Sequence, residues 1–168
     1  ENYGVECVGY NTTGEQVEAA RALIDERGLG GHLSVVEAVY REVDGHFDKV
    51  AHIGVLEHAG RDAVAEMVKA MADCLKPGGV GVLHFIGHVG RFDTEFYIRK
   101  HIFPGGWIPS LSEAMNAMAA NRLEILDVEN LRRGYALTLD EWAKRFEHHW
   151  PEIRQLDPQK FDEVFYRK

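Results

Sequence analysis

A carboxylate and two imidazoles stand at the ends of two apolar segments of the chain. Glu57 and His58 follow the apolar residues 50–53, and His84 lies within the apolar segment 80–85. If both segments are strands of one parallel sheet, their carboxyl ends lie at one edge, which is where open α/β sheets bind ligands. Carboxylate and imidazole groups at such an edge could move a proton or hold a small ion. We therefore expect a functional site there.

These residues also have purely structural interpretations. Glu57 could cap the following helix or pair with a neighbouring cation. His84, inside an otherwise apolar segment, could be a hydrogen-bonded histidine of the core. Tyr135, further along the chain, could be a buried aromatic residue whose hydroxyl is hydrogen-bonded. Residue types and spacing alone leave these alternatives open.

The segments that would position these residues alternate between strands and helices. Apolar spacing predicts strands at 5–10, 33–39, 50–53 and 80–85, and helices at 14–26 and 63–75. Asn11, Thr12 and Thr13 could cap the first helix, and LKPGG at 75–79 predicts a turn before the last strand. The alternation predicts a doubly wound, mostly parallel Rossmann-like α/β sheet.

The second half of the chain follows a different pattern. Residues 90–110 are aromatic and interrupted by proline and glycine, which indicates an insertion that covers a site. A helix at 111–120, a strand at 123–131 and an amphipathic helix at 138–150 are predicted after it, and a further helix from 158. Thr138 and Glu141 match a capping box at the start of the amphipathic helix.

Length and charge restrict the classes of protein to consider. The 168 residues fit one domain, and the net charge of -8 argues against a nucleic-acid partner. Cys7 and Cys74 lack metal-ligand spacing, so we expect small buried residues in a reducing compartment and no metal site. The sequence shows no signal peptide and no apolar run of transmembrane length, which makes a cytoplasmic protein the expectation. Because residue 1 is Glu1, we interpret the chain as a fragment.

Longer motifs carry a family resemblance. They are FDKVAHIGVLEHAG (47–60), LKPGG (75–79), LHFIGH (83–88), YIRKHIFPGGWIPS (97–110) and RRGYALTLDEWAKRFEHHWPEI (132–153). In these segments, in this order, the chain resembles the cyclopropane-fatty-acyl-phospholipid synthases and the related mycolic acid cyclopropane synthases. Those enzymes are S-adenosylmethionine-dependent methyltransferases. The resemblance implies methylene transfer to the double bond of an unsaturated fatty acyl chain, most simply of a phospholipid.

The resemblance also implies the catalytic residues. In the family, residues matching Glu57, His84 and Tyr135, with the backbone at Ile86, hold a bicarbonate ion that acts as the general base. Methyl transfer to an alkene leaves a carbocation, and ring closure requires loss of a proton from the new methyl group. The family's cysteine ligand to that ion has no match at Cys7 or Cys74.

For the cofactor, the resemblance assigns two segments. Asn11, Thr12 and Gln16 match positions beside the ribose and methionine of S-adenosyl-L-methionine, and Tyr40 and Arg41 match positions beside its adenine. The remaining expected contacts are Ile53 and His58. Val39 stands where the family commonly has an acidic residue, a role that Glu37 could take.

The resemblance covers residues 1–168 as a partial methyltransferase domain, with 90–122 as a lid. The family's first strand, its glycine-rich loop and its last strand are expected outside the chain. Arg99, Lys100 and His101 suit a lipid-facing lid at a membrane surface, although the segment could simply cover a cavity. A homodimer is left open. The alternatives are a same-scaffold methyltransferase that acts on an amine or forms a methyl branch, and a non-catalytic partner chain.

Overall fold

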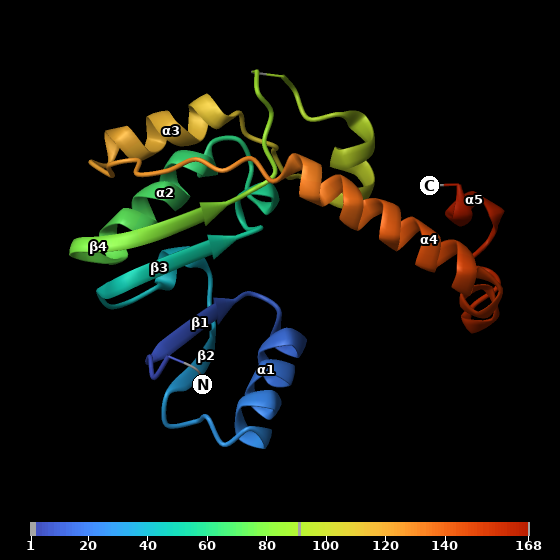
Figure 1. Cartoon of the computed structure of the whole chain (residues 1–168), viewed down its shortest axis with the longest axis horizontal. Coiled ribbons are helices and arrows are strands. Elements are labelled where there is room, and N and C mark those ends of the chain that lie inside the picture. Colours follow the sequence, from blue (N-terminus) through green and yellow to red (C-terminus); the bar gives the residue numbers. More distant parts are fainter. Residues whose placement is uncertain (1–2, 91, 168) are drawn as a thin grey trace. The chain divides into compact units, whose positions relative to one another are not determined.

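The computed structural model describes residues 3–90 and 92–167. The chain divides into two compact units, Glu1–Ile125 and Leu126–Lys168. The first unit contains every strand of the described chain and three longer helices, whereas the second contains two helices (Figure 1). Each unit is described separately.

Strands and helices alternate in the first unit as predicted. In chain order its elements are β1 (Cys7–Asn11), α1 (Gly14–Glu26), β2 (Leu33–Glu37), η1 (Tyr40–Glu42), β3 (Phe47–Ile53), η2 (Leu56–His58), α2 (Ala63–Cys74), β4 (Leu75–His84), η3 (Ile98–Ile102) and α3 (Leu111–Ala120). The strands form two parallel pairs, β1 with β2 and β3 with β4. Each pair is joined through a helix, the usual crossover connection between parallel strands. The predicted parallel α/β architecture is confirmed.

Helix α2 supplies most of the core. Val64, Met67, Val68 and Met71 lie at helical spacing, and all four side chains are buried. Val64 and Met67 pack with Leu56 from η2 and with Trp107. Because Leu56 directly precedes Glu57 in sequence, packing on α2 fixes the backbone on which that carboxylate stands.

Several boundaries differ from the predictions. Strand β4 begins at Leu75, because Leu75 pairs with Phe47 before a register shift, so the LKPGG segment lies within the strand. The strand predicted at 123–131 is wrong, since those residues pair with no strand of the described chain. Its mixed apolar pattern gave no defined buried face. Cys74 is buried as expected, but Cys7 is exposed, so its predicted burial is wrong.

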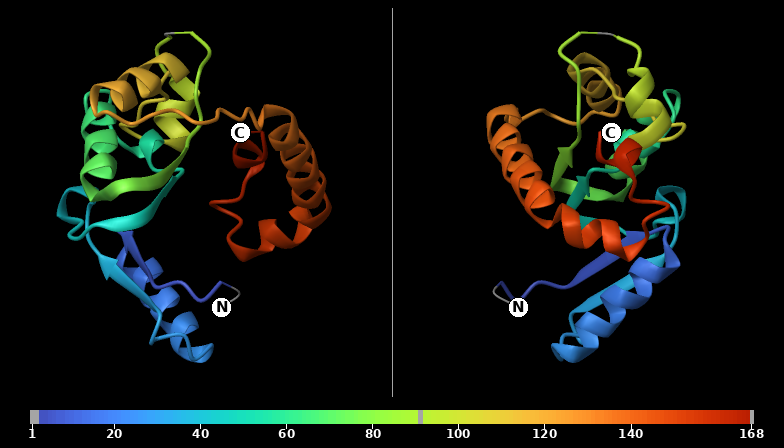
Figure 2. Two further views of the ribbon diagram at one scale, coloured as in Figure 1. Left: turned by 60° about the vertical axis from the view of Figure 1, so that its left-hand side comes forward. Right: turned by 90° about the vertical axis from the view of Figure 1, so that its right-hand side faces the viewer.

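The second unit consists of α4 (Arg132–Leu156) and α5 (Glu163–Tyr166). Helix α4 is longer than predicted and starts six residues before Thr138, whose hydroxyl donates to the Gly134 carbonyl inside the helix. The predicted capping box is therefore wrong. Beyond α4 the chain turns back, so that α5 lies beside the second half of α4 (Figure 2). Aromatic contacts hold the two helices together, with Trp150 stacked on Phe165 at 6.4 Å and Phe146 on Tyr166 at 5.8 Å.

Burial of His52 predicts a pH-dependent stability. The Nδ1 atom of His52 on β3 is buried and has no hydrogen-bond partner among the described residues. Burial lowers the pKa of this imidazole. Below about pH 6.5 the unfolded chain therefore binds more protons than the folded chain, and the free energy of unfolding falls as the pH falls.

We expect His52→Leu to flatten the change in unfolding free energy between about pH 7.5 and about pH 5, measured by urea titration at each pH. His46→Leu, which alters an exposed histidine, is the control and should keep the slope of the parent chain. An unchanged slope in His52→Leu would show that burial of this imidazole has no energetic consequence.

Candidate active site

The site forms around Glu57, which is 1% exposed. Strand β3 ends at Ile53, and Gly54 turns the chain with a φ of 63°. Its N–H donates to the His84 carbonyl at 3.0 Å, which keeps the turn attached to β4. Leu56, fully buried against α2, then anchors η2. Glu57 therefore projects from a short turn that is held on both sides.

Two hydrogen bonds connect Glu57 to distant segments. Its Oε1 accepts from the N–H of Ile86, just after β4, at 2.5 Å. Its backbone carbonyl accepts from the N–H of Trp107 at 3.2 Å. The Oε2 atom is buried and has no hydrogen-bond partner among the described residues. One residue thus joins the ends of β3 and β4 to the segment that follows η3, and keeps one carboxylate oxygen unpaired.

Gly106 makes this close approach possible. A Cβ atom built on Gly106 would lie 2.0 Å from the Glu57 carbonyl oxygen, and 2.9 Å from the Cβ of Phe103. Any side chain here would therefore displace the backbone of η2 or of the covering segment. Sequence reasoning did not identify this residue, although the glycine pair before Trp107 was visible.

The other residues predicted at the strand ends are exposed. His84 ends β4 opposite Ile53 in the register of the sheet, and neither is buried. The interpretation of His84 as a core histidine is therefore wrong. His58 is exposed, and its ring meets the edge of Phe103 at 4.9 Å. The structure thus brings Glu57 and Ile86 into direct contact and leaves His84, Ile53 and His58 accessible at the same ends of β3 and β4.

Tyr135 belongs to the second unit. It lies in the first part of α4, is 49% exposed, and contacts the ring of Trp142 at 6.5 Å. Its participation in a site with Glu57 therefore stays a prediction.

The segment after β1 carries the polar side chains expected beside the cofactor. Asn11 Nδ2 donates to Gln16 Oε1 at 2.8 Å, and Asn11 Oδ1 accepts from the N–H of Thr13 at 2.8 Å. Thr13 occupies the N-cap of α1 without a capping bond from its side chain, so its predicted capping role is wrong. Thr12 is exposed. Asn11 and Gln16 are therefore fixed relative to one another at the carboxyl end of β1.

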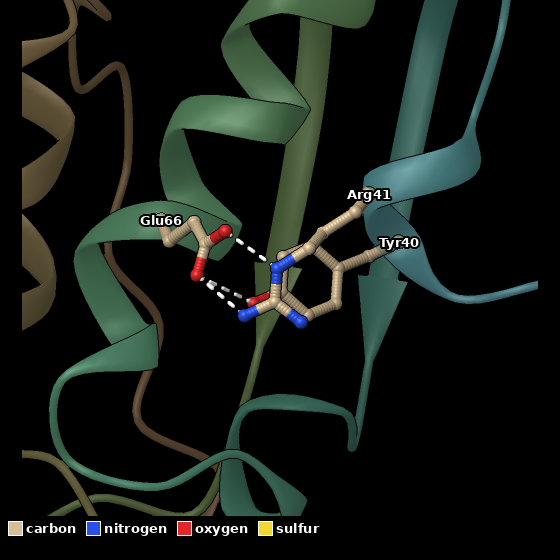
Figure 3. A network of polar contacts seen from close by, with 3 residues as sticks. All are labelled: Tyr40, Arg41 and Glu66. Atoms are coloured by element: carbon tan, nitrogen blue, oxygen red, sulfur yellow. Dashed lines mark hydrogen bonds and ion pairs between the residues drawn. The ribbon is translucent and has the colours of Figure 1, made fainter.

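A charged network holds the segment expected beside adenine (Figure 3). The Nε and Nη2 atoms of Arg41 donate to the two carboxylate oxygens of Glu66 on α2, at 2.5 and 2.6 Å, and the Tyr40 hydroxyl donates to the same carboxylate at 3.0 Å. The Arg41 hydrogen bonds lower the pKa of the Glu66 carboxyl. Burial and the bond to Glu66 raise the pKa of Tyr40. Arg41 also covers one face of the Tyr40 ring, 4.7 Å from its centroid.

Sequence reasoning missed Glu66. Nothing in the residue spacing linked it to Tyr40 and Arg41, which stand 26 and 25 positions earlier. The expected substitute acid, Glu37, lies instead with its carboxylate beside Gly14, at the first turn of α1. Val39 donates its backbone N–H to Glu42 at 3.0 Å. The acid that accepts the Tyr40 hydroxyl hydrogen bond is thus Glu66, which reaches it from another element.

Residues 92–110 cover the Glu57 side of the first unit. Thr94 is buried and accepts from the N–H of Ile108 at 2.9 Å, and Trp107 is 8% exposed. Within η3, Arg99, Lys100 and His101 are exposed. Lys100 lies over the Phe96 ring at 5.4 Å. The segment therefore has a packed inner side and a basic, aromatic outer side.

Residues 3–90 and 92–167 contain neither a membrane-spanning helix nor a cluster of metal-ligating side chains. No helix there combines the length and apolar character needed to cross a membrane. No group of three or more His, Cys, Asp or Glu side chains there could hold a metal ion.

The two groups that the resemblance implies can be tested against these residues. The unpaired, buried Oε2 of Glu57 requires a hydrogen-bond donor, and the hydroxyl of a bicarbonate ion is one. The accessible polar atoms of Asn11, Thr12 and Gln16 suit the hydroxyls and carboxylate of S-adenosyl-L-methionine. In both cases the chemistry of the residues present fits the group.

Comparison with known proteins gave concordant matches. A family model described as mycolic acid cyclopropane synthetase matches residues 1–167. A probable fatty acid methyltransferase of Pseudomonas putida is 31% identical, and the match covers 94% of this chain and 42% of that protein. The cyclopropane-fatty-acyl-phospholipid synthase of Escherichia coli K12 is 30% identical, with 98% and 42% covered. The chain therefore spans less than half the length of these curated relatives.

Solved structures show the same fold. The cyclopropane synthase MmaA2 of Mycobacterium tuberculosis superposes with a TM-score of 0.86 at 24% identity, over 98% of this chain and 63% of that one. The mycolic acid cyclopropane synthase CmaA1 complexed with SAH and CTAB gives a TM-score of 0.82 at 22% identity, with 99% and 62% covered.

The contact at Gly106 generates a prediction about the covering segment. We expect Gly106→Ala to lower the free energy of unfolding by about 1–3 kcal/mol, because the new methyl group overlaps the Glu57 carbonyl. Gly31→Ala is the control, since a Cβ at Gly31 meets no atom within 4 Å. Denaturant titration of both variants measures the difference, and equal stability of the two would contradict the close approach.

Proposed function

Because the chain belongs to the mycolic acid cyclopropane synthetase family, we propose that it carries the catalytic centre for S-adenosylmethionine-dependent cyclopropane formation. The reaction transfers a methylene group to the double bond of an unsaturated fatty acyl chain, most simply of a phospholipid. The observation that carries this proposal is the buried Glu57 carboxylate, with one oxygen held by Ile86 and the other unpaired.

Glu57 is suited to hold a bicarbonate ion through its Oε2 atom. When bound, this ion would accept the proton that the new methyl group loses as the ring closes. The Ile86 N–H already donates to Glu57, so Ile86 supports the ion by fixing the carboxylate that holds it. His84 and Tyr135 are the further proposed donors, one from the end of β4 and one from α4.

Burial strengthens the interaction of the Glu57 carboxylate with a hydrogen-bond donor. A carboxylate in a water-poor site interacts strongly with a donor, whereas water competes for an exposed carboxylate. The Gly106 and Trp107 backbone lies against the Glu57 carbonyl and contributes to the exclusion of water. We propose that residues 90–122 act as the lid of this centre.

The cofactor would lie at the carboxyl ends of β1 and β3. Asn11, Thr12 and Gln16 follow β1. Ile53 ends β3, and His58 belongs to η2 just beyond it. Ligands of doubly wound sheets bind between strand ends where the winding direction changes. Tyr40 and Arg41, held by Glu66, would border the adenine side.

The outer side of the lid supports a lipid substrate. Arg99, Lys100 and His101 are exposed beside Phe96 and Tyr97. Basic side chains can meet phosphate headgroups while aromatic rings lie at the membrane interface. We propose a cytoplasmic protein that contacts the membrane surface peripherally, which brings acyl chains to the site.

A second candidate reaction has its own support. The 31% identical Pseudomonas putida relative is described as a probable fatty acid methyltransferase, so methyl transfer that leaves a branch instead of a ring is the alternative. Both reactions can be separated by incubating the full-length protein with an unsaturated phospholipid and labelled S-adenosylmethionine. Recovery of a cyclopropane ring in the acyl chain supports the first, and a methyl branch supports the second. An unchanged acyl chain would contradict both.

We expect Glu57→Gln and Tyr135→Phe each to reduce turnover by about a hundredfold, the scale of losing positioned acid–base help. Folding and cofactor affinity should stay near those of the parent, because the shapes are nearly conserved. If both residues hold one ion, the double variant loses less than the product of the single losses. Turnover is measured for the parent, the two single variants and the double variant, and cofactor affinity is measured by calorimetric titration. Full turnover in both single variants would show that Glu57 and Tyr135 take no part in the reaction.

The network in Figure 3 predicts a separate effect on cofactor binding. Glu66→Gln removes the charge that holds Arg41 and leaves one acceptor for Arg41 and Tyr40 to share. We expect the Kd for S-adenosylmethionine to rise about tenfold, equivalent to about 1.4 kcal/mol. Asp73→Asn removes an exposed pair with Lys69 on the same helix and should leave the Kd unchanged. Equal Kd values for the two variants would show that the Glu66 network does not contribute to cofactor binding.

A further inference from the structure

A cavity of about 310 Å³ is lined by residues from two segments of the first unit. Arg61 comes just before α2, and Phe92, Asp93 and Trp107 belong to the segment that covers Glu57. This volume lies at the lower end of the range for small-molecule sites, which is roughly 300–1,000 Å³. The proposed reaction gives none of the four lining side chains a task, so the cavity requires an explanation of its own.

The covering segment forms one wall of this cavity from two separate stretches of chain. Asp93 and Trp107 directly precede Thr94 and Ile108, and the buried Thr94 hydroxyl accepts from the Ile108 N–H at 2.9 Å. This bond keeps the two stretches side by side. The relative positions of Asp93 and Trp107 are therefore set by the fold before any ligand arrives.

Two hydrogen-bond donors of the cavity lack an acceptor. Trp107 is 8% exposed, and its Nε1 atom is buried without a partner among the described residues. The guanidinium of Arg61 lies over the Trp107 ring, 4.8 Å from its centroid, and Arg61 forms no ion pair within residues 3–90 and 92–167. Buried polar groups in proteins normally have partners. A phosphate oxygen would supply an acceptor to the indole and a charge to the guanidinium.

The opposite charge also stands in the cavity. Asp93 is exposed and pairs with no cation in the part of the chain that the structure describes. Beside it, the Phe92 ring packs over Gly90, where a Cβ atom would lie 2.7 Å from the ring. A carboxylate next to an aromatic ring suits an ammonium group. A simple phosphate would be repelled by Asp93, so the cavity favours a ligand that carries both charges.

We propose that this cavity binds the phosphoethanolamine headgroup of a phospholipid, with its phosphate at Arg61 and Trp107 and its ammonium at Asp93. The inference rests on the proposed function, because it names the class of phospholipid that is presented to the Glu57 centre. A lipid is favoured as the source because the Trp107 backbone N–H donates to the Glu57 carbonyl, so the cavity adjoins the proposed centre. The exposed basic residues of η3 attract any anionic surface, whereas the cavity distinguishes one headgroup.

Titration of soluble headgroups into the full-length protein tests binding apart from any reaction. We expect glycerophosphoethanolamine to shift the indole N–H resonance of Trp107 downfield, because that N–H gains an acceptor. It should bind about fivefold more tightly than glycerophosphoglycerol, the scale of one exposed ion pair. An unmoved Trp107 resonance would overturn the proposal. Inorganic phosphate that binds as tightly as glycerophosphoethanolamine would also overturn it.

Charge-removing substitutions separate the two halves of the site. Arg61→Gln should raise the Kd of both soluble headgroups by about fivefold, whereas Asp93→Asn should raise only the Kd of glycerophosphoethanolamine. Arg27→Gln and Asp140→Asn remove exposed charges that do not line the cavity and are the matched controls. If Asp93→Asn weakened both headgroups equally, Asp93 would have a structural role and its assignment would be wrong.

Mixed vesicles test whether the ligand is a lipid. Phosphatidylethanolamine and phosphatidylglycerol with the same unsaturated acyl chains share one membrane surface, so a difference between their products reports the headgroup alone. With labelled S-adenosylmethionine, we expect the parent to modify phosphatidylethanolamine about fivefold faster, and Asp93→Asn to bring the two rates together. Equal rates in the parent, with glycerophosphoethanolamine still bound, would overturn the lipid in favour of a soluble phosphoethanolamine ester.

A failure of the proposed function can be told apart from a failure of this site. If neither lipid is modified, the proposed function is contradicted, and flotation with the same vesicles then decides the headgroup site. Vesicles rich in phosphatidylethanolamine should retain the parent more strongly than Asp93→Asn. Equal retention of the two proteins would overturn the site.

Discussion

The hydrogen bond from the Ile86 N–H to the Glu57 carboxylate is the constraint on which the site depends. A buried carboxylate without a donor would be strongly destabilising, so the end of β4 must stay beside η2 for as long as the fold persists. The backbone carbonyl of Glu57 also accepts a hydrogen bond from the Trp107 N–H, which holds the covering segment. Three segments that are far apart in sequence are thereby fixed around Glu57, whose Oε2 atom is buried without a hydrogen-bond partner among the described residues.

Helix α2 supports this arrangement through both its buried face and its exposed face. Its buried face, with Val64 and Met67, packs against Leu56 and Trp107 and so locates Glu57 and its cover. Its exposed face presents Glu66, which holds Tyr40 and Arg41. The proposed catalytic region and the proposed cofactor region therefore both rest on helix α2. A change in the core packing of α2 should therefore alter both regions. No described hydrogen bond joins a side chain of one region directly to a side chain of the other.

Much of this could be predicted from the sequence. The bounds of α1 and α3, the inward face of α2 and the parallel strand pairs follow from apolar periodicity, which is strong where one face is buried. Glu57 and Ile86 were identified through motifs, and the structure brings them together. Glu66 and Gly106 were not identified, because one acts across elements that only tertiary structure brings together and the other acts through the absence of a side chain. The strand predicted at 123–131 failed because strands require a partner, and an isolated apolar pattern cannot supply one.

The exchange rate of a single amide tests the central role of the Glu57 carboxylate most directly. In Glu57→Ala, the Ile86 amide loses its acceptor, whereas the Trp107 amide keeps the Glu57 backbone carbonyl and the Gly54 amide keeps the His84 carbonyl. We expect exchange at Ile86 to accelerate by about tenfold or more relative to the parent chain, while Trp107 and Gly54 stay close to their parent rates. An unchanged rate at Ile86, or an equal acceleration at all three amides, would contradict it.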